Sequence, residues 1–368
     1  MLALNEQYRL PPLLQAQMHL ADSSGALAVI SASGVRTSHG GSQFSTNWDV
    51  CGPSGTAREH ACWRYPIAKR ILNERGVSRE SIRDALEATH QNRYGSTIYS
   101  HVTNLSTREF DLYYAGDFSR PLRFRLADLI AGGPRSLLMR ELFTEAPVVR
   151  AFNAWQASGA AAGVKALRAA GGPPERLAES LHELHWNALN QVNRYADGRT
   201  FFEAWLAATG GKDPATDFYA GLTALTNGEA EKAEASFARQ AEVDLAQGDG
   251  PGYGRPAAGF LRALRGERPA DANAHFELEG HHDAKFVGVY NITNNTVRAF
   301  LLRTKTGWAR DFALPPGKIQ YAFMVDGEIL LDPKNPVTEE ATYDGDAEWV
   351  GHRKLNATVI AQAPRPER

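Results

Sequence analysis

The spacing of apolar residues changes twice along the chain. Up to about residue 133, short alternating runs typical of strands are mixed with runs spaced for helices. From about 134 to 268 helical spacing prevails, and from about 270 to 362 short alternating strands return with turn residues between them. The pattern predicts an α+β protein with parts at 1–133, 134–268 and 270–362, followed by a disordered tail at 363–368.

The first part begins with a predicted strand pair. Met18–Ala21 and Ala26–Ser31 are apolar, and the Asp-Ser-Ser-Gly sequence between them is typical of a hairpin turn. A third strand is predicted to end at Phe44–Asn47. Two helices follow, one closed by Gly76 and the next capped by Ser78. Alternation then predicts two more strands, at Thr97–Val102 and Glu109–Tyr114.

The middle part reads as helices separated by Ala/Gly-rich breaks at 159–163 and 171–174. The predicted helices are Leu137–Trp155, Pro174–Tyr195, Thr216–Thr226 and Ala230–Ala246. Gly221, Ala233 and Phe237 have the offsets of the small-small-aromatic pattern of tetratricopeptide (TPR) repeats. Because one such unit is legible, the pattern predicts an αα-hairpin, which we describe as TPR-like.

Composition and charge narrow the classes of function. The 368 residues carry a formal net charge of −2, and no basic run is long enough to neutralise a row of phosphates, which excludes nucleic acid as an expected partner. No run of about 18 apolar residues occurs, so no membrane association is predicted. Cys51 and Cys62 do not form a metal-binding or redox motif; they either pair in one disulfide or, as we expect, stay free thiols.

Three stretches of the first part occur in a telling order: 18–30 (MHLADSSGALAVI), 45–47 (STN), and 62–65 (CWRY) followed by 89–91 and 97–102. Together they resemble the linear amide C–N hydrolases of the N-terminal-nucleophile (Ntn) class. This group includes choloylglycine hydrolase and acyl-CoA:6-aminopenicillanate acyltransferase. The resemblance covers roughly residues 5–130, and it implies part of an αββα sandwich that acts on N-acyl amide substrates without a metal or organic cofactor.

The resemblance also implies roles for two residues. In this class an N-terminal cysteine attacks the amide carbonyl, and its own α-amino group acts as the base. Asn47 would donate to the developing oxyanion through its side-chain amide, and Arg64 would orient the nucleophile as a cation on the site floor. Taken without the resemblance, an Asn at a strand end is an ordinary turn residue, and this Arg is a solvated or stacked side chain.

The nucleophilic cysteine of the family has no counterpart in residues 1–368. Cys51 and Cys62 follow Asn47 and cannot offer an α-amino base. We therefore expect one of two cases. Either the chain is a truncated or split form of the hydrolase, whose partner would be the missing N-terminal half, or it is an inactive remnant of the hydrolase that is kept for its other parts. Loss of strand partners would leave sheet edges open, so the isolated chain is expected to be poorly soluble or a homodimer. The compartment stays undetermined: cytoplasmic as written, extracytoplasmic if an upstream signal peptide was lost.

The last part shows a second resemblance, over about residues 275–336. Gly307-Trp308, Leu314-Pro-Pro-Gly317, Tyr321–Gly327 and Asp332-Pro-Lys-Asn335 look like the glycogen-binding module of AMP-activated kinase β subunits. The resemblance implies an early-set immunoglobulin-like sandwich. The two sugar-stacking tryptophans of that family are absent, because 290–296 has none and Glu328-Ile329 stands where the second would be. Trp308 matches a core tryptophan, so a structural sandwich is expected rather than a glucan-binding one.

Two alternatives to an amide hydrolase therefore stay open. One is a non-catalytic interaction protein that uses the helices and the sandwich, and the other is a carbohydrate-binding protein. His182 and His185, at i and i+3 of a predicted helix, could face one metal, but no third ligand is evident and a polar helix surface is the prediction.

Overall fold

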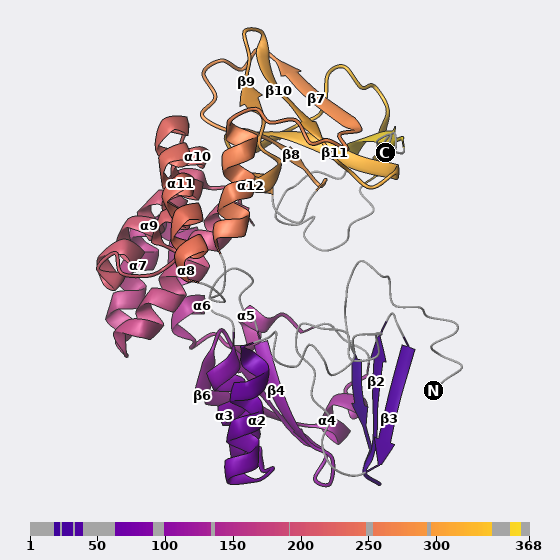
Figure 1. Ribbon diagram of the computed structural model, residues 1–368. Coiled ribbons are helices and arrows are strands. Elements are labelled where there is room, and N and C mark those ends of the chain that lie inside the picture. The colour runs from indigo at the N-terminus through magenta and orange to yellow at the C-terminus, as the bar shows by residue number, and fades with distance from the viewer. Residues whose placement is uncertain are drawn as a thin grey trace. The chain divides into compact units, whose positions relative to one another are not determined.

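The computed structural model describes residues 18–22, 24–31, 34–39, 63–90, 99–133, 137–190, 192–247, 253–292, 296–340 and 354–361 (Figure 1). Within these residues the chain is an α+β protein, as predicted: small antiparallel sheets come first, helices follow, and antiparallel sheets come last. The chain divides into two compact units, Met1–Thr144 and Glu145–Arg368.

The described elements of the first unit are two three-stranded antiparallel sheets and several helices. Their bounds are β1 Met18–Ala21, β2 Ala26–Ser31, β3 Gly34–His39, α2 Arg64–Arg75, α3 Arg79–Thr89, β4 Tyr99–Asn104, β5 Glu109–Tyr114, β6 Asp117–Arg125, α4 Leu126–Ala131 and α5 Met139–Leu142.

The predicted strand pair is confirmed as the β1–β2 hairpin. The Asp22 carboxylate closes the turn, because its Oδ1 accepts hydrogen bonds from the backbone N–H groups of Ser24 at 2.9 Å and Ala26 at 3.1 Å. The third strand of this sheet, β3, pairs with β2 along Gly34–His39. The predicted strand end at 44–47 lies outside the described residues.

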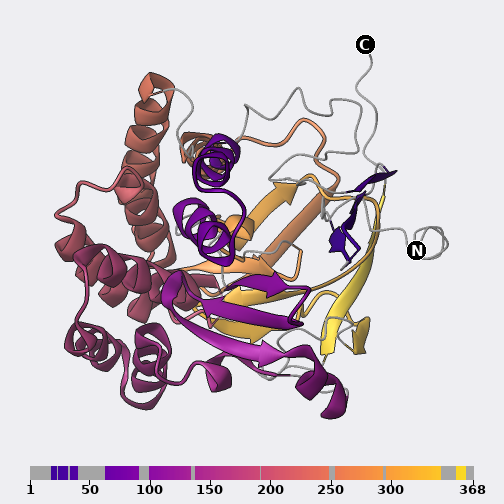
Figure 2. The same cartoon turned by 90° about the horizontal axis from the view of Figure 1, so that it is seen from below.

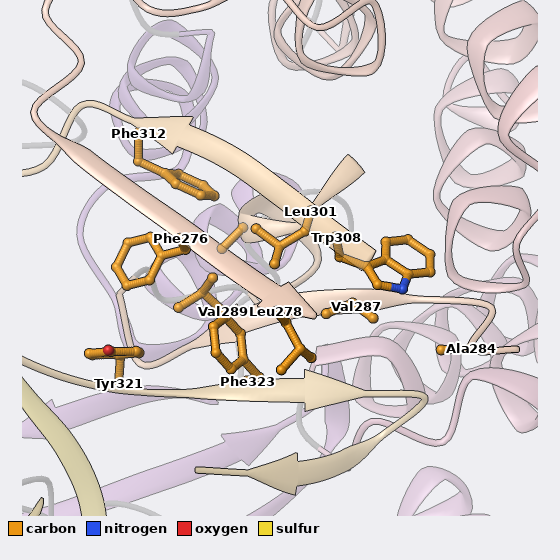
Figure 3. Packing of buried hydrophobic residues seen from close by; sticks show 11 residues of the cluster. Phe276, Leu278, Ala284, Val287, Val289, Leu301, Trp308, Phe312, Tyr321 and Phe323 are labelled. Atoms are coloured by element: carbon orange, nitrogen blue, oxygen red, sulfur yellow. The ribbon is translucent and has the colours of Figure 1, made fainter. Parts of the chain in front are cut away.

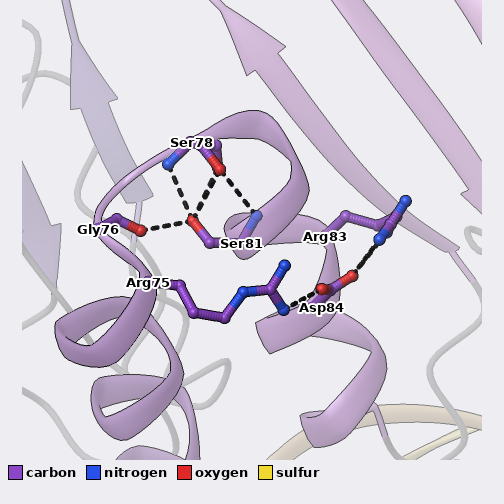
Figure 4. Close-up of polar contacts among 6 residues, drawn as sticks. All are labelled: Arg75, Gly76, Ser78, Ser81, Arg83 and Asp84. Carbon is purple, nitrogen blue, oxygen red and sulfur yellow. Dashed lines mark hydrogen bonds and ion pairs between the residues drawn. The ribbon is translucent and has the colours of Figure 1, made fainter.

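Helices α2 and α3 occur where the sequence predicted two successive helices, and they pack against each other (Figure 2). Gly76 closes α2 with a φ of 71°, a conformation that suits glycine. Ser78 caps α3: its Oγ accepts from Ser81 N at 3.1 Å, and Ser81 Oγ accepts from Ser78 N at 2.8 Å (Figure 4). The Arg75 guanidinium pairs with Asp84 of α3, so the two helices are held at this end by both a cap and an ion pair.

The second sheet of this unit, β4–β5–β6, has two different faces. On one face the buried residues Val102, Tyr113 and Phe118 pack against Ile82 and Leu86 of α3. Strand β5 was predicted with the observed bounds, whereas β6 was not predicted. Its sequence, DFSRPLRFR, contains three arginines and a proline and lacks the apolar run that marks a strand.

The second unit begins with seven helices among its described residues. Their bounds are α6 Pro147–Ser158, α7 Ala160–Ala170, α8 Pro174–Asn190, α9 Tyr195–Thr209, α10 Thr216–Thr226, α11 Ala230–Gln247 and α12 Gly254–Leu264.

Three predictions in this region were wrong. The single helix predicted at Leu137–Trp155 is broken into α5 and α6, because Ala146 is extended ahead of Pro147. The helix predicted to reach Tyr195 ends at Asn190, and Tyr195 begins α9. The break predicted at 159–163 is limited to Gly159, and α7 starts directly after it.

Glycines allow the helices of each hairpin to approach closely. An added Cβ at Gly163 of α7 would lie 3.1 Å from Ala151 O of α6, and one at Gly198 of α9 would lie 2.6 Å from Leu189 of α8. Gly221 of α10 faces Phe237 of α11, whose ring would be 2.6 Å from a Cβ. The α10–α11 hairpin therefore packs through the residues that the sequence pattern singled out.

The strands of the second unit form two antiparallel sheets, β7–β10–β9 and β12–β11–β14–β13, with β8 also paired to β11. Their bounds are β7 Ala274–Glu279, β8 Val287–Tyr290, β9 Leu302–Arg303, β10 Gly307–Phe312, β11 Gly317–Val325, β12 Glu328–Leu330, β13 Thr338–Glu340 and β14 Lys354–Ile360; a short 3₁₀ helix, η3, spans Thr296–Ala299.

One hydrophobic core joins these two sheets (Figure 3). Phe276 and Trp308 come from the first sheet, and Tyr321 and Phe323 come from the second. Trp308 is a core residue, as predicted, with 5% of its surface exposed. The sheets therefore pack face to face through side chains that alternate along their strands.

The helices and sheets of the second unit also contact each other directly. Phe260 of α12 stacks on Phe300, with ring centroids 6.1 Å apart and planes 9° from parallel. At a second contact the Tyr195 ring meets Phe286 edge-on at 4.9 Å. Gly228, after α10, approaches Lys285 so closely that an added Cβ would lie 3.2 Å from the Lys285 Cα. The sequence pattern predicts a boundary between the helical part and the β-rich part near residue 269, but the two parts share buried surface.

This shared surface predicts joint unfolding. Phe300 is 1% exposed, and Phe300→Ala should lower the free energy of unfolding by about 3–5 kcal/mol. Chemical denaturation is followed by far-ultraviolet circular dichroism, which reports the helices, and by Trp308 fluorescence in a variant without the other tryptophans, which reports the sheets. We expect the substitution to shift both unfolding transitions to the same lower midpoint. Val359→Ala, at a side chain that is 74% exposed, is the control. Two separate transitions, of which only the sheet transition moves, would contradict the prediction.

Candidate functional site

Arg64 is the first residue of α2, so the predicted position of an arginine at the start of a helix is confirmed. Its side chain is half-buried, and the next residue, Tyr65, is buried at 7% exposure. The first turn of α2 contains no acidic residue, and the N-cap residue Trp63 makes no side-chain cap hydrogen bond. The guanidinium therefore belongs to a helix start that already carries partial positive charge.

Asn47, the other predicted residue of the amide-hydrolase site, lies outside the described residues, and so do Cys51 and Cys62. The distance between Asn47 and Arg64 is therefore not part of the described structure. His90, from the third motif, is described: its Nδ1 lies 2.5 Å from Glu87 O, and its ring packs 5.7 Å from that of Phe118. These contacts give His90 a place in the packing of α3 against the sheet.

Asp111 forms a buried charged cluster that sequence reasoning missed. Its side chain on β5 is 3% exposed and pairs with Arg79 of α3 and with Arg123 of β6, whose Nε lies 3.0 Å from Asp111 Oδ1. Two arginines on one carboxylate compensate for its removal from water. The signal in the sequence was the position of Asp111, which shares the inward face of β5 with Tyr113.

His182 and His185 are not on a polar helix surface, and that prediction was wrong. They are 4% and 2% exposed, because α9 and α10 cover this side of α8. The Tyr219 ring lies 4.6 Å from the ring of His182 and 5.7 Å from that of His185. Helical periodicity located the two rings on one face, but the covering of that face comes from helices distant in sequence.

The hydrogen bond between His185 and Thr223 fixes which ring nitrogen carries a proton. The Thr223 hydroxyl donates to Tyr219 O at 2.8 Å, so its oxygen, 3.0 Å from His185 Nε2, accepts the proton that this nitrogen carries. Burial, with a smaller contribution from His182, lowers the pKa of His185 to about 3. Within the described part of the chain, no group of three or more His, Cys, Asp or Glu side chains is arranged to hold a metal ion.

The sheets of the second unit contain a network of buried polar groups. The Tyr321 hydroxyl donates to Asp332 Oδ2 at 2.7 Å and accepts from Asn335 Nδ2 at 3.1 Å, and burial raises the pKa of Tyr321 to about 12. Asn356, fully buried, accepts from Asp332 N at 2.7 Å. In the described residues from 253 to 361 no Phe, Tyr or Trp side chain is exposed.

Comparison with known proteins does not add to these observations. No family model matches the chain, and no curated protein matches it. Among the described residues, no helix has the length and apolar character that crossing a membrane requires.

The buried His185 predicts a loss of stability in mild acid. The folded state keeps this ring neutral, whereas the unfolded chain takes up a proton below pH 6.5, so the unfolded state binds more protons and stability falls as the pH falls. One pH unit below 6.5, at about pH 5.5, the loss should be about 1.4 kcal/mol from this group, while carboxylates are still ionised. Urea unfolding at pH 7.5 and 5.5 measures it.

His185→Gln provides the comparison, with the exposed His101→Gln as a matched control. His185→Gln should be less stable at pH 7.5 but should lose about 1.4 kcal/mol less than the wild type on going to pH 5.5. Equal pH dependence of the wild type and His185→Gln would show that His185 does not titrate as described.

Proposed function

We propose that residues 1–133 are part of the catalytic domain of an amide hydrolase of the N-terminal-nucleophile class, acting on linear N-acyl amides. In this proposal Asn47 donates to the oxyanion, and Arg64 is the cation that orients the nucleophile. The cysteine nucleophile is contributed from outside residues 1–368, so these residues alone are inactive. The ordered motifs at 18–30, 45–47 and 62–102 are the basis of the assignment.

The two-faced β4–β5–β6 sheet is the structural observation that carries this proposal. While α3 covers one face, the opposite face carries aromatic residues: Phe110 stacks on Phe124 at 5.1 Å, and Tyr114 stacks on Phe143 at 5.3 Å. None of these three sheet residues is fully buried. A sheet with helices on one face and apolar side chains on the other is suited to pack against a further layer, as in an αββα sandwich.

The electrostatics around Arg64 agree with its proposed role. The start of α2 combines a guanidinium with the positive end of a helix of 12 residues, and no acidic residue stands in its first turn. Such a setting stabilises a thiolate or a developing oxyanion, and it lowers the pKa of a nearby cysteine. Lysine would keep the charge but would lose the planar fork of donors, so the two residues should not be interchangeable.

The test uses the complete gene product, which is residues 1–368 with any sequence encoded in frame ahead of them. Hydrolysis of a panel of N-acyl amides should be measured for the wild type and variants. We expect Asn47→Ala to lower kcat about 10²–10³-fold with little change in KM, because the donor acts on the transition state. Arg64→Lys should also lose activity, whereas Arg70→Ala, at an exposed position of the same helix, should not.

Two outcomes would contradict the amide-hydrolase proposal. One is full activity in Asn47→Ala on any amide that the wild type hydrolyses. The other is the absence of amide hydrolysis by the complete gene product across the panel, together with no cysteine exposed at a processed N-terminus. Circular dichroism of each variant checks that a loss of activity does not come from unfolding.

A second candidate function is that of a non-catalytic interaction protein, and the helices of the second unit support it. The second unit contains three successive helical hairpins, α6–α7, α8–α9 and α10–α11, and in each one a glycine lies where the two helices touch. Stacked hairpins of this type form extended binding surfaces in repeat proteins. TPR-like helices followed by an immunoglobulin-like sandwich would then form the useful part. Such a function would be unaffected by Asn47→Ala, which separates it from the amide hydrolase.

A further inference from the structure

Arg310 is a charged residue in an apolar setting. It lies on β10 between Trp308 and Phe312, and because side chains alternate along a strand it shares the face of these two core residues. Its guanidinium carbon is 4.5 Å from the centroid of the Phe300 ring and 4.7 Å from that of Phe312. Burial lowers the pKa of Arg310 to about 10.

The guanidinium of Arg310 donates hydrogen bonds to neutral acceptors and forms no ion pair among the described residues. Its Nη1 donates to Phe300 O at 2.9 Å and to Arg298 O at 3.3 Å, and both acceptors are neutral. Within the residues that the structure describes, no carboxylate pairs with it. Two other arginines that pack against the folded chain do have a carboxylate partner: Arg79 pairs with the buried Asp111, and Arg199 pairs with Glu229 at 2.8 Å.

A second arginine belongs to the same corner. The carbonyl of Arg298, in η3, accepts from Arg310, and burial lowers the pKa of the Arg298 side chain as well. Of the two arginines, Arg310 is the less exposed. A cation taken out of water is stabilised by an anion that pairs with it and satisfies its remaining donors.

The donors of Arg310 that remain define the kind of anion. Nη1 is used by the two carbonyls, whereas Nε and Nη2 have no acceptor among the described residues and retain contact with solvent. The edge formed by Nε and Nη2 is planar and pairs with two oxygens of one carboxylate or phosphate. We propose that Arg310 is the centre of a binding site for an oxyanion, a carboxylate or phosphate group, which takes both hydrogen bonds of this edge.

Isothermal titration calorimetry on the full chain tests the proposal. Inorganic phosphate and acetate are titrated separately, with chloride at matched ionic strength as the blank. We expect saturable binding of at least one of the two at one site per chain. Arg310→Gln should abolish it, and Arg310→Lys should weaken it at least about tenfold because lysine lacks the bidentate edge.

Arg303→Gln is the matched control, because Arg303 also lies over an aromatic ring, 4.7 Å from the Trp308 centroid, and donates to backbone carbonyls, yet is exposed. It should leave the affinity unchanged. The absence of saturable binding of either anion by the wild type would overturn the proposal. Equal affinity of the wild type and Arg310→Lys would overturn it as well, and this comparison stays valid if Arg310→Gln does not fold.

Discussion

The contact between Phe260 and Phe300 is the interaction on which the second unit depends. Phe260 lies within the helical core, 4.8 Å from Phe237, while Phe300 lies against the sheets beside Arg310. Neither the helical hairpins nor the two sheets enclose all their large apolar side chains alone. Burial of each therefore requires the other, and the free energy of the contact is shared between them.

Two polar side chains of the sheet part, Asp326 and Arg310, hold the backbone beside the rings that contact the helices. Asp326 accepts hydrogen bonds from the backbone N–H groups of Lys285 and Phe286, at 2.9 and 2.8 Å, and so fixes the ring that meets Tyr195. Arg310 holds the carbonyls that flank Phe300. Because these bonds are directional, they fix the local positions of Phe286 and Phe300, the two rings of the sheet part that meet Tyr195 and Phe260 of the helices.

The first unit is organised differently, around the α2–α3 pair and the sheet that α3 covers. The Ser78 cap, the Arg75–Asp84 ion pair and the buried Asp111 hold α3 on the inner face of β5. The ion pair joins the last turn of α2 to α3, whereas Arg64 lies at the first turn of α2. The opposite face of the sheet carries the stacked rings of Phe110 and Phe124, and in the proposed function a further layer would pack there.

Local signals in the sequence predicted the elements that local physics controls. The Asp22 turn, the Ser78 cap and the strand β5 have the predicted positions because each depends on hydrogen bonds or alternation within a few residues. Glycine-rich segments misled: Gly159 ends a helix, but Gly163 lies inside the next one, where its missing side chain admits a neighbouring helix. The burial of His182 and His185 was also not predictable, because it depends on helices more than ten residues away.

The candidate site was predictable in part. The sequence indicated that Arg64 begins a helix, and α2 begins there, whereas the neighbourhood of Asn47 falls outside the described residues. Arg310 was missed because an arginine on an alternating strand ordinarily faces solvent. Its inward position depends on Phe300 and Phe312, which come from different segments and meet only in the folded chain.

Native-state hydrogen exchange tests most directly whether helices and sheets form one cooperative structure. The slowest amides of α8 and α10 and those of β11 should open with the same free energy, and both should respond to denaturant with the slope of global unfolding. An opening free energy for the β11 amides that is lower than that of the helices by several kcal/mol, with a smaller slope, would mean that the sheets unfold independently and that the shared core does not couple the two.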